Sequence, residues 1–95
     1  MSRLQQLFEK HDNEYLKFDG IVEKRNNRPD IHAFLMLDEI QPSKNGLDMV
    51  SAAEHDEIFL SIDVDGLFLT EEQVIELLRC GVRYDEEYDC FAMFV

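Results

Sequence analysis

The sequence predicts a single α+β domain, because helical and strand-like patterns alternate along one short chain. Residues 71–80 have the apolar spacing and the capping residues of a helix, and residues 4–18 repeat apolar side chains at helical spacing. Residues 58–64 instead alternate apolar and polar side chains, as a strand with one buried face does. With 95 residues, 45% of them hydrophobic, the chain is long enough for one core and too short for two. We therefore expect one domain over residues 1–95, with a small, mostly antiparallel sheet of about four strands packed against two main helices, the N-terminal one and residues 71–80.

The N-terminal helix is predicted from a single apolar face, which consists of Leu4, Leu7, Phe8, His11, Tyr15 and Phe18. Ser2 stands where a helix cap is expected, with Gln5 as its reciprocal partner in a capping box. Asp19 and Gly20 then predict a left-handed end to this helix.

A loop and a strand are predicted next. Residues 24–30 are polar, and Pro29 prevents a helix from passing through them and favours an extended Arg28. The apolar run at residues 31–37 is interpreted as a buried strand that pairs with residues 20–22.

A second break is predicted at residues 41–46, where Asn45 and Gly46 are a turn signal. Asp48 is then expected to cap a short helix that reaches Ala53, before the alternating strand begins at Ile58.

The helix at residues 71–80 has the clearest boundary signals. Thr70 is predicted to cap it and Gln73 to close the capping box, while Leu69 packs against Val74 as a hydrophobic staple. Gly81 is expected to end it.

The last residues are predicted to form a hairpin in which residues 82–84 pair with residues 90–95. Six consecutive apolar residues in the second of these strands indicate a strand that is covered on both faces.

The net charge of −12 is the unusual feature of the composition, with 9 Lys and Arg against 21 Asp and Glu. Residues 1–30 have six basic and six acidic residues, whereas residues 31–95 have three basic and fifteen acidic ones. This composition argues against direct binding to nucleic acid, which needs cationic groups, and against docking on anionic membranes. No apolar run approaches the roughly 20 residues of a membrane span, and the polar start is unlike a signal peptide. We expect a cytoplasmic protein.

No catalytic or cofactor site is predicted. Cys80 and Cys90 form no CxxC pair and are expected to be free, partly buried thiols, as is usual in a reducing compartment. His11 and His55 each precede an aspartate, but the further ligands of a metal-dependent hydrolase have no counterpart here. Four separated glycines form no phosphate-binding loop. We expect a protein that is not an enzyme, with no metal and no cofactor.

Residues 61–72 resemble a calcium-binding EF-hand loop, since Asp63, Asp65, Gly66 and Glu72 fall at ligand and turn positions. Ser61 replaces the first acid, apolar residues are interspersed, and a strand rather than a helix leads into the loop. We interpret the segment as a strand end, a turn and a capped helix, and a degenerate calcium-binding loop remains an alternative.

Clustered carboxylates supply the main functional hypothesis. They fall at a turn, along a helix and at a hairpin tip, and the residues selected are Asp63, Asp65, Glu72, Glu76, Asp85, Glu86 and Glu87. If these elements share one edge, they form a ribbon of negative potential that imitates a phosphate backbone and binds a basic protein surface. The alternative is that these carboxylates only keep the protein soluble.

A second hypothesis is apolar. Aromatic and large apolar residues gather in and near the last strand, namely Phe59, Phe68, Tyr88, Phe91, Met93 and Phe94. Any that one small core leaves exposed favour a homodimer or a structural, self-assembling protein.

The segments AAEHDEIFL (52–60), RCGVRYD (79–85) and AMFV (92–95) resemble small acidic proteins predicted in bacteriophage genomes. The resemblance implies a phage or prophage setting, where small acidic proteins often bind and block a host protein. It brings no activity and no site residues.

Overall fold

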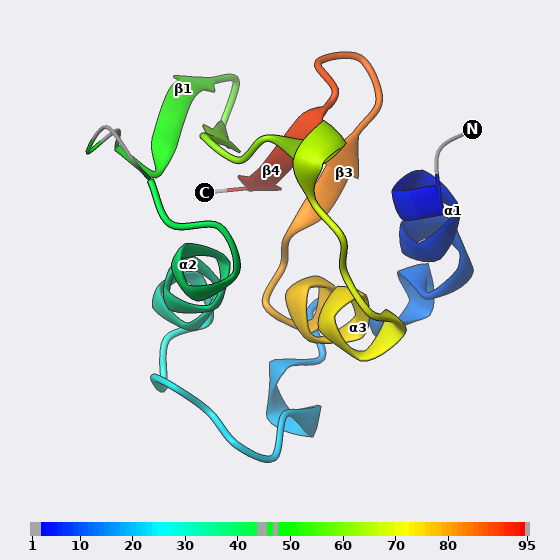
Figure 1. Ribbon diagram of the computed structural model, residues 1–95. Coiled ribbons are helices and arrows are strands. Elements are labelled where there is room, and N and C mark those ends of the chain that lie inside the picture. The colour runs from blue at the N-terminus through cyan, green and yellow to red at the C-terminus, as the bar shows by residue number, and fades with distance from the viewer. Residues whose placement is uncertain (1–2, 44–45, 47, 95) are drawn as a thin grey trace.

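The computed structural model describes residues 3–43, 46 and 48–94, and it confirms the α+β fold (Figure 1). In this part of the chain three α-helices and four strands follow one another in the order α1 (Arg3–Lys10), α2 (Pro29–Ile40), β1 (Val50–Glu54), β2 (Glu57–Leu60), α3 (Glu71–Arg79), β3 (Arg83–Asp85) and β4 (Cys90–Phe94). Short 3-10 turns lie at Asp12–Glu14, Phe18–Gly20 and Val64–Gly66.

The sheet is antiparallel throughout and has the strand order β1-β2-β4-β3. The predicted C-terminal hairpin is confirmed, with Tyr84 of β3 opposite Phe91 of β4. Because β4 lies between β2 and β3, Phe91 and Ala92 are completely buried, as the apolar run indicated. The predicted cover on both faces does not extend to Phe94 at the end of β4, which is exposed. Figure 1 shows the strands in the upper part of the molecule, with α2 and α3 below them and α1 beside them.

The start and end of α3 agree with the sequence signals. The Thr70 hydroxyl accepts the Gln73 N–H at 3.2 Å, and the Gln73 side chain accepts the Thr70 N–H at 2.9 Å. Leu69 and Val74 are both completely buried. Gly81 has φ +95°, the left-handed conformation that ends a helix. The helix ends at Arg79, one residue before the predicted end.

The N-terminal helix is shorter than predicted, because α1 ends at Lys10 and 3-10 turns replace the rest. Asp12 and Asn13 compete with helical hydrogen bonding through their short polar side chains, which favours turns. Tyr15 and Phe18 nevertheless pack against the core as expected. The predicted left-handed Gly20 is wrong, since the residues with positive φ in the described chain do not include it. The predicted cap at Ser2 lies outside the described residues.

The prediction of a buried strand at residues 31–37 is wrong, because these residues belong to a third helix, α2. Arg28 is extended as expected, but Pro29 is the first helical residue, where a missing N–H costs nothing. Ala33, Met36 and Leu37 face the core, a spacing that fits a helix. A short apolar run has no periodicity of its own to separate a buried strand from a buried helix.

The predicted short helix from Asp48 to Ala53 is also wrong, since β1 occupies this segment. A two-residue turn, His55 (φ +53°) and Asp56 (φ +64°), connects β1 to β2. The sheet therefore has four strands, but its first strand lies later in the chain than predicted. β2 ends at Leu60, before the 3-10 turn that follows.

The capping box at Thr70 provides a test of this fold. We expect Thr70→Ala to lower the free energy of unfolding by about 1 kcal/mol, because the Gln73 N–H loses its acceptor at the helix start. Urea denaturation followed by circular dichroism measures the loss. Thr70→Ser keeps the hydroxyl and should retain most of the stability, and equal losses in both variants would contradict the capping role.

Candidate functional site

The structure distributes the seven predicted site carboxylates over three places. Asp63 and Asp65 flank the 3-10 turn after β2, Glu72 and Glu76 lie one helical turn apart on α3, and the remaining members, Asp85, Glu86 and Glu87, lie at the end of β3 and in the turn to β4. In Figure 1 the turn between β3 and β4 lies at the top of the view, whereas the helix α3 lies in its lower half, beyond the strands β3 and β4. The α3 carboxylates therefore do not join the hairpin carboxylates in one compact patch.

Glu76 is occupied within the protein. Its Oε2 accepts hydrogen bonds from His32 Nε2 at 2.9 Å and from Arg25 Nη1 at 3.2 Å. Its side chain is half-buried between these partners. Glu76 is thus a structural residue of the contact between α2 and α3, and it contributes little free charge for a partner.

His32 is completely buried on α2, and both of its ring nitrogens are used. Nδ1 accepts the Arg25 backbone N–H at 3.0 Å, so the proton lies on Nε2, which donates to Glu76. Phe18 packs edge-on against the ring at 5.8 Å between centroids. No role for His32 can be predicted from the sequence, because its contacts with Arg25 and Glu76 depend on residues 31–37 being helical.

Basic residues of the first thirty neutralise a second carboxylate of α3. Lys10 and His11 both contact Glu71, and these hydrogen bonds lower the pKa of its carboxyl below its ordinary value, the bond from His11 having the larger effect. In a further ion pair the basic residue is on α3 and the acidic one is in the N-terminal segment, since Arg79 contacts Glu14 at 2.9 Å. Three ion pairs therefore connect α3 to residues 1–30, through Lys10, Glu14 and Arg25.

The sheet half of the molecule keeps its negative charge. Residues 48–70 and 82–94 include one basic residue, Arg83, and ten acidic ones, Asp48, Glu54, Asp56, Glu57, Asp63, Asp65, Asp85, Glu86, Glu87 and Asp89. Arg83 pairs with Glu57. Within the described ranges, no ion pair includes the site carboxylates other than Glu76.

The exposed Tyr88 reports the resulting potential. Glu87, followed by Glu54, burial and Asp85, raises the pKa of its hydroxyl above the ordinary value, since nearby negative charge disfavours the phenolate. The surroundings of Tyr88 at the hairpin are therefore negative.

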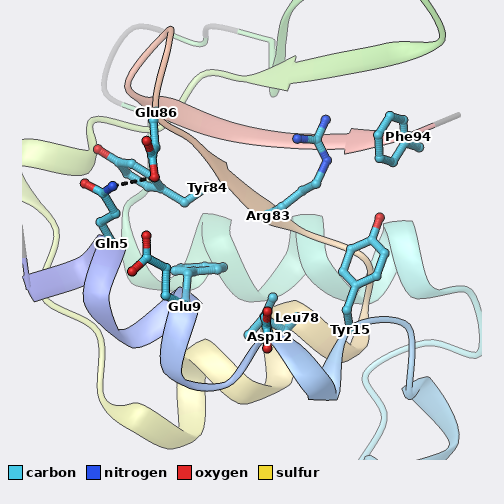
Figure 2. Close-up of a pocket in the computed structure, with 10 residues that line it drawn as sticks. Gln5, Glu9, Asp12, Tyr15, Leu78, Arg83, Tyr84, Glu86 and Phe94 are labelled. Atoms are coloured by element: carbon cyan, nitrogen blue, oxygen red, sulfur yellow. Dashed lines mark hydrogen bonds between the residues drawn. The ribbon is translucent and has the colours of Figure 1, made fainter. Parts of the chain in front are cut away.

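A groove of about 370 Å³ lies between α1 and β3. Aromatic and aliphatic side chains form much of its wall, namely Phe8, Tyr15, Leu78, Tyr84 and Phe94. Its polar lining consists of Gln5, Glu9, Asp12, Arg83 and Glu86 (Figure 2). Of the predicted site residues only Glu86 lines the groove, and no pattern in the sequence indicates it because its walls come from distant segments.

The aromatic residues of the second hypothesis divide into buried and exposed groups. Phe59, Phe91 and Met93 are buried, and β4 is a central strand. Phe68, Tyr88 and Phe94 are exposed, although Arg3 stacks on Phe68 and Arg83 on Phe94. A homodimer through the last strand remains a prediction.

The loop that resembles an EF-hand uses its side chains locally. Asp63 accepts the Asp65 N–H at 3.2 Å, and the Gln41 side chain holds the Asp63 backbone at 2.7 and 3.0 Å. Among residues 3–43, 46 and 48–94, no group of three or more His, Cys, Asp or Glu side chains is placed to hold a metal ion.

Both cysteines are free, as predicted. Burial, with a smaller contribution from the charge of Glu76, raises the pKa of Cys80 to about 12. Burial also raises the pKa of the less enclosed Cys90, and Asp85 and Asp89 add to the effect.

Comparison of the chain with protein-family models, with curated proteins and with solved structures found no match. A separate search for membrane-crossing segments found no helix of sufficient length and apolar character in the described part of the chain.

Replacement of His32 tests its structural role. We expect His32→Ala to lower the free energy of unfolding by about 2–4 kcal/mol, because it opens a cavity and leaves the Arg25 N–H without its acceptor. Chemical denaturation measures the change. His55→Ala is the matched control, since the His55 side chain is 86% exposed, and this variant should remain within about 0.5 kcal/mol of the parent.

Thiol titration tests the environment of the cysteines. The pKa of Cys80 is about 12, so at pH 8 its thiol is almost entirely protonated, and we expect it to stay unreactive toward a disulfide reagent in the native protein. We expect Cys90 to react slowly, because its pKa is also raised. Cys80→Ser should leave the native reaction unchanged and remove one thiol from the denatured count. A rapid reaction of the native protein that disappears in Cys80→Ser would show that Cys80 is accessible and reactive, and would contradict its burial and raised pKa.

Proposed function

We propose that this chain is a non-enzymatic, acidic protein-binding module whose sheet half docks on a basic surface of a partner protein. The observation that carries the proposal is the distribution of ion pairs. Basic residues pair with Glu71 and Glu76 of α3, whereas six of the seven predicted site carboxylates, Glu72 among them, are left without a basic partner in the described structure.

The site that we propose is narrower than the sequence-based one. Its centre is the hairpin end, Asp85, Glu86 and Glu87, with Asp63 and Asp65 as further charges of the sheet half. Glu72 is exposed on α3 and lies away from this centre, and Glu76 is bound by His32 and Arg25. An uncompensated surface of this kind accelerates association with a basic partner and selects against acidic ones.

A nucleic-acid-binding protein is the partner class that fits best. The basic groove of such a protein displaces counterions from phosphates, and the carboxylates of the sheet half offer comparable negative charge without a nucleic acid. Together with the resemblance to small acidic phage proteins, this favours a phage-encoded inhibitor that acts in the host cytoplasm. We do not expect the chain itself to bind nucleic acid or membranes.

Affinity capture tests this function. The chain is immobilised and exposed to a bacterial lysate in about 0.1 M salt, then washed in about 1 M salt, which shortens the Debye length from about 10 Å to about 3 Å. We expect a nucleic-acid-binding protein to elute with salt and also with a double-stranded DNA competitor. Recovery of the chain alone, through self-association that resists salt, would instead favour the homodimer.

Charge-reversal variants locate the surface. Glu86→Lys/Glu87→Lys should abolish capture, because it reverses the charge of the hairpin turn. Asp19→Lys/Glu23→Lys makes the same change in net charge at exposed positions outside the sheet half, and it should retain capture. Equal loss in both double variants would show that net charge alone holds the partner, and unchanged capture in the hairpin variant would overturn the proposed site.

A further inference from the structure

Three carboxylates line the groove between α1 and β3, those of Glu9, Asp12 and Glu86, and two of them, from distant segments, lie at the same end (Figure 2). Glu9 comes from α1 and Glu86 from the turn after β3. Figure 2 shows their carboxyl groups at the end of the groove where Gln5 and the ring of Tyr84 also lie. The hairpin surface thus continues into a hollow of the molecule.

These two carboxylates lack a cation. Gln5 donates to one oxygen of Glu86 at 2.5 Å, which positions the group and leaves its charge in place. Neither Glu9 nor Glu86 takes part in any ion pair among the described residues. The adjoining wall includes Phe8 and Tyr84, whose ring centroids are 6.4 Å apart. Aromatic faces and carboxylates both attract cations, so this end of the groove is complementary to a positive group.

The opposite end of the groove already holds a guanidinium. The Arg83 Cζ lies 4.2 Å from the centroid of the Phe94 ring, and Glu57 pairs with the same side chain. Since Glu57 compensates Arg83, this internal cation does not neutralise the Glu9 and Glu86 end. The same pairing recurs outside the groove, where Arg3 stacks on Phe68 at 4.3 Å.

We infer that the groove binds an arginine side chain of a basic partner protein, with the guanidinium against the Tyr84 ring and hydrogen bonds to Glu9 and Glu86. A guanidinium fits better than an ammonium, because it is planar, stacks on aromatic rings and can pair with two carboxylates through its fixed fork of donors. This inference rests on the proposed function and names the group that the acidic surface recognises.

Two blocked tripeptides test the groove directly. The probes are acetyl-Ala-Arg-Ala-amide and the same peptide with citrulline, which keeps the shape of arginine without its charge. Titration into ¹⁵N-labelled protein should shift amide signals of α1 and β3 saturably with the arginine peptide. We expect binding of the citrulline peptide to be at least about tenfold weaker. Equal binding of the two peptides, or shifts that avoid α1 and β3, would overturn the inference.

Variants separate the groove from general attraction to an acidic protein. Glu9→Gln removes one groove carboxylate on the exposed face of α1 and should weaken the arginine peptide at least about fivefold. Asp19→Asn removes the same charge at an exposed position outside the groove and should leave binding unchanged. Equal weakening in both variants would show attraction to net charge and would refute the groove.

The two proposals can fail independently. If lysate capture depends on Glu86 and Glu87 but is unaffected by Glu9→Gln, and the arginine peptide does not bind, the groove inference fails and the proposed function stands. If the peptide binds selectively but no basic protein is captured, the groove stands and the proposed function fails.

Discussion

The contact of Glu76 with His32 and Arg25 determines how the helical half of this protein is assembled. His32 is fully enclosed, so its two nitrogens must find partners inside the protein, because an unsatisfied buried polar group is costly. Arg25 supplies the backbone donor and Glu76 the acceptor, which brings the polar loop, α2 and α3 to one point. The buried face of α2 then packs on the core beside α3.

This contact also decides where the charge remains. Two basic residues of the first thirty positions pair with α3, since Lys10 contacts Glu71 and Arg25 contacts Glu76 as well as Glu39 of α2. The sheet half has few basic residues of its own, so its carboxylates face solvent without compensation. Exposed ion pairs contribute little to stability, typically below about 1 kcal/mol. Their larger consequence here is electrostatic, since they leave most of the net negative charge on the sheet half.

How much could be predicted from the sequence depends on whether a signal was local. The capping box of α3 and the C-terminal hairpin involve neighbours in sequence, and both were predicted correctly. Pro29 is compatible with two structures, because proline breaks a helix when it lies inside one but is favoured at the first helical position. The neighbouring residues do not show which of the two applies. β1 was missed because its residues pair with β2 rather than being buried. The carboxylates of the candidate site could be selected from the sequence because they are clustered acidic residues. The hydrogen bond that ties Glu76 to His32, and the groove that includes Glu9, could not be predicted, because both depend on contacts between segments that lie far apart.

The tertiary contacts of α1 also constrain the order in which this protein can fold during synthesis. Arg3 donates to the carbonyl of Leu69, and Gln5 bonds Glu86, so the first helix finds partners more than sixty residues later in the chain. An eight-residue helix is too short to be stable alone in water. The beginning of the chain must therefore wait, without lasting structure, until α3 and the hairpin have left the ribosome. During that interval its apolar face, Leu4, Leu7 and Phe8, which the folded protein buries, stays exposed to water and to other proteins.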